Sequence, residues 1–185
     1  MEKNTDANLQ SIIKFLEIAG MLKRTPRTGW VEVDVSQPES VADHTFRTAI
    51  LCMLYADIES LNSLKLLRMA LIHDLPEAVI GDLTPIEKTE ATKEREEKSI
   101  KQILGLLPME QRERYITVWI EYQEGLTREA QALRQLEKIE MALQAKEYQK
   151  AGSTSQSLER FIKSAEEATL WPELKRLLLL VSEET

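Results

Sequence analysis

Apolar residues recur at steps of three and four along most of the chain, which is the spacing of a helix that buries one face. The first such segment covers about residues 8–23. Its buried face is expected to consist of Leu9, Ile12, Leu16, Ala19 and Leu22. Similar segments follow at about 40–56, 63–75, 87–107, 108–122, 127–150 and, as two helices, 157–183. The pattern predicts an all-helical fold of about seven or eight helices, in a single domain spanning residues 1–185.

Capping residues and prolines mark where these helices begin. Ser40, Ser63 and Thr127 stand at the start of apolar-periodic runs, where a side-chain oxygen can accept a hydrogen bond from a free backbone N–H. Pro108 and Pro172 suit a first helical turn, because the N–H that proline lacks would be unpaired there anyway. These five positions predict the starts of five helices.

Two stretches interrupt the helical pattern. Residues 24–40, RTPRTGWVEVDVSQPES, hold two prolines and a glycine, and a short alternation at WVEVDV is compatible with an extended chain. A loop of this length inside a compact domain is uncommon and often functional. The second stretch, GSTSQS at 152–157, is typical of a linker. It would separate a core at about 24–150 from C-terminal helices at about 157–183.

Composition and charge exclude several classes of protein. The 43% hydrophobic and 30% charged residues suit a globular domain. With 31 acidic and 24 basic residues the formal charge is −7, so no broad basic face for nucleic acid is expected. The longest apolar runs, AILCMLYA and LLLLV, fall far below the ~20 residues of a membrane-spanning helix, so no membrane partner is expected. The polar first ten residues and the single Cys52 favour a cytoplasmic location.

The stretch MALIHDLPEAVIGDLTP, residues 69–85, places several charges beside an apolar run. His73 and Asp74 follow the run directly, and Glu77 and Asp82 come within the next eight positions. A polar group that is buried without a partner costs on the order of 1–3 kcal/mol. Some other group is therefore expected to compensate these side chains.

The chain has two histidines, His44 and His73. Their helices are joined by a short polar turn, and helices joined in this way pack antiparallel, which would bring both side chains face to face. A lone helical histidine is more often a hydrogen-bonded core residue. Here, however, Asp74 follows His73, and Glu77 would lie one turn further on the same face if the helix continues. A divalent cation would compensate all of these groups, because neutral imidazole and carboxylate are its normal ligands.

The sequence resembles the HD-domain phosphohydrolases, in the branch of small 5′-deoxynucleotidases and their eukaryotic relatives. The matching elements are SVADH at 40–44, ALIHDLPEAVIGDLTP at 70–85 and QLEKIEMALQAKEY at 135–148. The resemblance covers about residues 24–148, and it is specific because separate elements agree in order. It implies a single-domain helical bundle of the HD type.

The resemblance also implies one divalent metal ion, held by His44, His73, Asp74 and a carboxylate from the long late helix. That carboxylate is normally the aspartate of an LD pair, and here LEK puts Glu137 in its place. The extra methylene group requires the helix to sit slightly back, or the carboxylate to bind in another mode. Mn²⁺, Co²⁺, Fe²⁺, Mg²⁺ and Zn²⁺ are all candidates, because such ligand sets follow the general order of affinities.

In this family the reaction is hydrolysis of a nucleoside 5′-monophosphate to nucleoside and phosphate. The resemblance gives Glu77 and Asp82 two catalytic tasks, orienting the attacking water and protonating the leaving ribose oxygen, without dividing these tasks between them. The alternative is a capped turn in which Asp82 bonds the backbone of the residues that follow it.

A phosphate monoester carries two charges, so a cation besides the metal is expected to bind it, and a guanidinium group does so in a bidentate way. Arg27, in the long loop near Trp30, is the first candidate, and Arg47, close after His44, is the second. Trp30 could stack on a base or sugar. As alternatives, Arg27 is a solvated loop residue, Trp30 anchors the loop in the core, and Arg47 pairs with an acidic residue.

The sequence therefore favours a metal-dependent 5′-nucleotidase whose partner is a small-molecule (deoxy)nucleoside monophosphate. The resemblance implies a homodimer, and the apolar helix at LKRLLLLV, residues 174–181, could supply its contact. Two other functions stay open, an HD-type phosphodiesterase and a catalytically weakened, nucleotide-binding regulatory protein. Asp43 and Glu140 are interpreted as ordinary charged helix residues.

Overall fold

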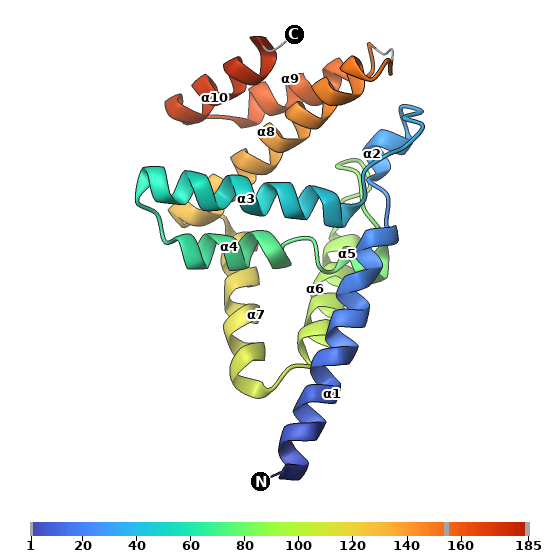
Figure 1. The fold of residues 1–185 in the computed structure, drawn as a ribbon, viewed down its shortest axis with the longest axis vertical. Coiled ribbons are helices and arrows are strands. Elements are labelled where there is room, and N and C mark those ends of the chain that lie inside the picture. Colours follow the sequence, from blue (N-terminus) through green and yellow to red (C-terminus); the bar gives the residue numbers. More distant parts are fainter. Residues whose placement is uncertain (1, 154–155, 184–185) are drawn as a thin grey trace.

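The computed structural model describes residues 2–153 and 156–183, and in this part of the chain eight helices have ten or more residues. Figure 1 shows their arrangement. The elements in chain order are α1 (Glu2–Ala19), η1 (Gly20–Arg24), α2 (Thr28–Val31), α3 (Val41–Glu59), α4 (Ser63–Ile72), α5 (Glu77–Ile80), α6 (Glu90–Leu104), α7 (Met109–Glu124), α8 (Arg128–Lys150), α9 (Glu159–Ala168) and α10 (Pro172–Glu183). The predicted all-helical fold of seven or eight helices is confirmed.

Helix α8 is the centre of the packing. It contacts the α3–α4 pair, α7, α9 and α10, and α3 and α4 lie side by side as predicted (Figure 1). The apolar stripes of these helices meet in one core, which includes the fully buried Leu66, Met69, Leu133 and Leu136. This packing fixes the ends of α3 and α4 against the middle of α8.

The capping residues place most of the helix starts correctly. Ser40 forms a capping box with Asp43, and Thr127 accepts a hydrogen bond from the backbone of α8. The prediction for Ser63 was wrong, because the side chain of Asn62 accepts the capping hydrogen bond from the Lys65 N–H. Asparagine caps as well as serine does, and here it stands one residue earlier.

The predicted buried face of α1 was largely wrong. Leu9 is 54% exposed and Leu16 is 59% exposed, while the core contacts come from Phe15, Ile18 and the end of the segment at Leu22. The N-terminal part of α1 runs past the end of the bundle (Figure 1), and the part of the predicted face that packs against the core is its end, Ala19 and Leu22. The periodicity identified the helix but not the face that packs.

The long loop at 24–40 is confirmed as a break between helices. It holds one short helix, α2, and no strand is formed at WVEVDV within the described residues. A bridge between Pro26 and Ser40 closes the loop at its base. The predicted linker at 152–157 lies partly outside the described residues. None of the described helices combines the length and hydropathy of a membrane span.

Candidate metal centre and active site

The segment after α4 bends because Pro76 begins the short helix α5. His73 ends α4, and turns link the Leu75 N–H to Ile72 and the Glu77 N–H to Asp74. The helix does not continue through this segment. Glu77 therefore does not lie one helical turn beyond His73 and Asp74 on the same face, as expected, but follows them in a tight turn. The turn still keeps His73, Asp74 and Glu77 together at one end of the α3–α4 pair.

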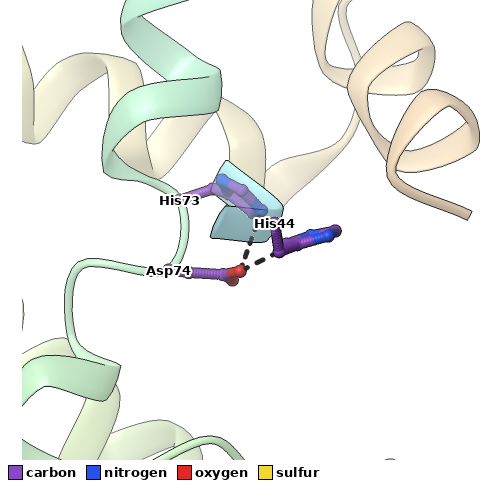
Figure 2. A group of neighbouring side chains, drawn as sticks. All are labelled: His44, His73 and Asp74. Carbon is purple, nitrogen blue, oxygen red and sulfur yellow. Dashed lines mark ion pairs between the residues drawn. The ribbon is translucent and has the colours of Figure 1, made fainter. Parts of the chain in front are cut away.

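His44 and His73 meet as predicted, with ring centroids 6.0 Å apart. The Nε2 atom of His73 lies 3.1 Å from Oδ2 of Asp74, and the Nε2 atom of His44 lies 3.9 Å from the same oxygen. Figure 2 shows the three side chains converging. They are buried or nearly so, and their ligand atoms lie within 4.8 Å of one another. This is a group that could hold a metal ion.

The hydrogen bonds of the two imidazoles leave both Nε2 atoms available. Nδ1 of His73 lies 2.7 Å from the carbonyl oxygen of Ala70, and a carbonyl only accepts, so Nδ1 carries the proton. Nδ1 of His44 donates in the same way to the buried carboxylate of Glu140. Within the described chain, Nε2 of His73 is buried without a hydrogen bond. An orphaned lone pair of this kind, facing Asp74, fits a metal ligand.

Glu137 on α8 lies beside the histidine pair. Its Oε2 is 3.7 Å from Nε2 of His73 and accepts a hydrogen bond of 3.0 Å from the Tyr122 hydroxyl, and its Oε1 is 3.4 Å from the Lys138 ammonium. Tyr122 also packs its ring edge against His73. The structure therefore brings the fourth predicted ligand to the site, with the tyrosine holding one of its oxygens.

Glu77 and Asp82 both line the same cleft as His44 and Asp74. Oε2 of Glu77 is buried and makes no hydrogen bond to the described residues. Burial raises the pKa of Glu77 well above its usual range, and the carboxylates of Asp74 and Asp82 raise it further. Burial alone would also raise the pKa of Asp74, but its interactions with His73, Arg27 and His44 hold it below its ordinary value.

Asp82 binds the long loop rather than the turn that follows it. Its Oδ1 accepts a hydrogen bond of 2.9 Å from Arg27, and its Oδ2 accepts one of 2.6 Å from the Thr28 N–H. The Thr28 hydroxyl donates in turn to the Asp82 carbonyl. Gly81 precedes these contacts with a φ of 82°, a conformation that favours glycine. The alternative interpretation expected Asp82 to bond the backbone of the residues that follow it. It was wrong, because Asp82 bonds Arg27 and Thr28 instead.

The cleft has a volume of about 490 Å³, which is the size of a small-ligand site. His44, Asp74 and Glu137 line it, and Arg27 and Lys88 supply cations near the carboxylates. Phe161 and Met141 give the wall an apolar section. The cleft thus combines a charged region with an apolar one.

All three predicted substrate-binding residues have partners within the protein. Trp30 is 1% exposed, its indole N–H donates to Glu39, and its ring centroid lies 4.1 Å from that of Phe161. It therefore anchors the loop, and it also contributes to the cleft wall. Arg47 does not line the cleft and donates to Glu140, as its alternative interpretation held. Arg27 lines the cleft, with its guanidinium on Asp82 and 3.8 Å from Asp74.

The interpretation of Glu140 as an ordinary charged residue was wrong, because its side chain is buried against His44. The signal was present in the spacing. Leu133, Leu136 and position 140 follow one another at steps of three and four, so residue 140 falls on the buried stripe of α8. Asp43, by contrast, is exposed as an ordinary charged helix residue would be, and it completes the capping box of Ser40.

The HD-domain family model matches residues 19–175 of the chain. The 5′-deoxynucleotidase HDDC2 of Homo sapiens is 39% identical over 170 residues, which are 91% of this chain and 83% of that protein. The 5′-deoxynucleotidase hdd1 of Schizosaccharomyces pombe is 35% identical over 157 residues, covering 82% of this chain and 79% of that one.

Solved structures show the same likeness. A crystal structure of a protein from Pyrococcus horikoshii OT3 matches with a TM-score of 0.77 and 30% identity, covering 91% of this chain and 97% of that chain. A predicted metal-dependent phosphohydrolase from Magnetospirillum magnetotacticum MS-1 matches with a TM-score of 0.72 and 25% identity, covering 96% and 95%. The helical fold, the converging histidines and these similarities agree: the chain belongs to the HD-domain family.

Proposed function

We propose that the protein is a metal-dependent phosphohydrolase that releases phosphate from (deoxy)nucleoside 5′-monophosphates. The observation that carries this proposal is the buried group of His44, His73 and Asp74. Both imidazoles use Nδ1 for a hydrogen bond, which leaves both Nε2 atoms available to a metal ion. The relatives HDDC2 and hdd1, both 5′-deoxynucleotidases by name, support the substrate class. The similarity to the predicted metal-dependent phosphohydrolase of Magnetospirillum magnetotacticum supports the use of a metal.

The residues present fit one divalent cation. His44, His73 and Asp74 would be its ligands, and Glu137 would supply the fourth protein ligand from α8. When bound, such an ion lowers the pKa of a water ligand and neutralises charge on phosphoryl oxygens. Tyr122 donates to Glu137 and so restricts the longer glutamate side chain to one position beside His73.

The chain's own groups account for the remaining steps. Arg27 and Lys88 lie in the cleft wall and would bind the phosphate dianion. Glu77, with its unpaired buried oxygen, and Asp82 lie in the same wall, and between them they would orient the water and pass a proton to the leaving 5′-oxygen. Arg47, which is engaged by Glu140, is left out of the substrate contacts.

Phosphate release from a panel of nucleoside and deoxynucleoside 5′-monophosphates tests the proposal. The assay compares Mn²⁺, Co²⁺ and Mg²⁺ for the wild-type protein, with Asp82→Ala as a control lacking one catalytic carboxyl. We expect metal-dependent release by the wild type and a severe loss in the variant. Release only from phosphodiesters would favour a phosphodiesterase, and nucleotide binding without release by either protein would favour the regulatory function.

The apolar section of the cleft is expected to hold the nucleoside. Replacing Phe161 with alanine removes the aromatic ring that α9 contributes to the cleft, without touching His44, His73 or Asp74. We expect KM to rise for deoxynucleoside monophosphates, with little change for deoxyribose 5-phosphate, which has no base. Steady-state kinetics with the two substrate classes check this. An equal rise for both would place the base elsewhere.

The homodimer and the cytoplasmic location stay proposals. Leu179 on α10 is 60% exposed, in keeping with the predicted contact at residues 174–181, but the apolar side chains of α1 are exposed as well. Sedimentation of the wild-type protein would give its oligomeric state.

A further inference from the structure

Glu140 is a buried carboxylate that the proposed reaction does not use. It lies on α8 one turn after Glu137 and is only 1% exposed. Its Oε2 accepts a hydrogen bond from Nδ1 of His44, and its Oε1 accepts one of 2.8 Å from Nε of Arg47. Both oxygens are therefore engaged, one by a predicted metal ligand and the other by a cation.

We propose that Glu140 is a positioning residue that fixes the ring of His44 with its proton on Nδ1, leaving Nε2 to bind the metal. The inference rests on the proposed metal-dependent function, because it assigns a role toward one ligand of that site. Histidine ligands commonly donate their second ring N–H to a carboxylate, which orients the ring and strengthens the ligand. Here the carboxylate comes from a different helix than the histidine.

Arg47 holds Glu140 in that position. Its guanidinium spans three acceptors on successive turns of α8, donating to Glu140, to Gln144 at 2.6 Å and to Glu147 at 2.7 Å. Arg47 itself lies one turn after His44 on α3. Helices α3 and α8 therefore supply all of these partners. The pair Arg47–Gln144 lies one turn further along both helices than the pair His44–Glu140.

A simple ion pair does not explain this arrangement. Arg47 already has Glu147 as a half-exposed partner, whereas Glu140 is buried, and a buried carboxylate needs more than one good contact to offset its lost hydration. The second contact of Glu140 is the imidazole. Glu140 bonds Nδ1 of this ring, whereas Nε2 on the other side of the ring faces Asp74. A positioning role toward His44 requires this arrangement.

Glu140→Gln tests the role, with Glu147→Gln as its matched control. Both substitutions remove one carboxylate that Arg47 binds, but Glu147 does not contact His44. We expect the dissociation constant for Zn²⁺ or Mn²⁺ to rise ~10–100-fold in Glu140→Gln, the usual loss when such a partner is removed. In Glu147→Gln it should stay near the wild-type value. Equal affinities in all three proteins would overturn the inference.

A spectroscopic measurement on the wild-type protein keeps the inference testable if Glu140→Gln does not fold. Because the chain has two histidines, ¹⁵N-imidazole spectra of the Zn²⁺-loaded protein resolve each ring. We expect Nε2 of His44 to carry the zinc and Nδ1 to carry a slowly exchanging proton. Zinc on Nδ1 of His44 would overturn the inference.

The two proposals fail in different ways. Zinc on Nε2 of His44, with reduced affinity in Glu140→Gln but no phosphate release, would refute the proposed reaction and leave the role of Glu140 intact. Phosphate release with unchanged affinity in Glu140→Gln would do the reverse.

Discussion

Replacing Asp74 with asparagine is expected to abolish turnover and to weaken metal binding by more than about 100-fold, because loss of an outer partner alone costs ~10–100-fold. Oδ2 of Asp74 lies 3.1 Å from Nε2 of His73 and 3.9 Å from Nε2 of His44. The amide keeps its shape but removes the charge that would face the cation. Isothermal titration with Mn²⁺ and phosphate release from dAMP measure the two effects.

Asp43→Asn is the matched control, since it makes the same substitution directly beside the other histidine. Asp43 caps α3 through Ser40 and does not line the cleft. The amide oxygen of asparagine can still accept the hydrogen bond from the Ser40 N–H, so metal affinity and turnover should stay close to those of the wild type. If Asp74→Asn bound the metal as tightly as the wild type, Asp74 would not be a metal ligand.

Glu77→Gln is expected to lower kcat by about 10²–10⁴-fold, the usual contribution of a general acid or base, while metal binding is retained. The substitution is nearly isosteric, and Oε2 of Glu77 has no hydrogen bond in the described structure that the amide would break. The amide can neither give nor take a proton. Steady-state kinetics at saturating metal, together with the metal titration, separate the two outcomes.

Glu87→Gln serves as the control for this variant. Glu87 is an exposed carboxylate that accepts hydrogen bonds from Thr84, close to the cleft but outside its lining. Its kcat should match that of the wild type. If Glu77→Gln also keeps its kcat, Glu77 is a structural residue of the turn and Asp82 or water must serve as the acid or base.

The fold could be predicted from the sequence where packing follows a local rule. The spacing of apolar residues and the capping side chains of Ser40 and Thr127 fix helices whatever lies around them. Helix α1 shows the limit of such rules. Its stripe at Leu9 and Leu16 is as regular as any other, but a face is buried only if a neighbour reaches it, and that depends on where the other helices end.

The meeting of His44, His73 and Asp74 could also be predicted, because the chain has only two histidines and a short turn joins their helices. The residues behind that group were harder to assign. Glu140 and Arg47 resemble ordinary surface charges in the sequence, and only the pairing of α3 with α8 makes them partners. Contacts between residues more than 90 positions apart leave no local pattern beyond the burial of position 140.

The contact between Arg27 and Asp82 joins the loop before α3 to the bend after α5 through side chains 55 positions apart. Arg27 donates to Asp82 through one of its two Nη atoms, so its other N–H donors can bind a phosphate dianion while this ion pair persists. Asp82 also accepts from the Thr28 N–H, so its carboxylate holds the long loop against the cleft whether or not a substrate is bound. Asp82→Ala would therefore loosen the loop that carries Arg27 as well as remove a carboxyl group from the cleft.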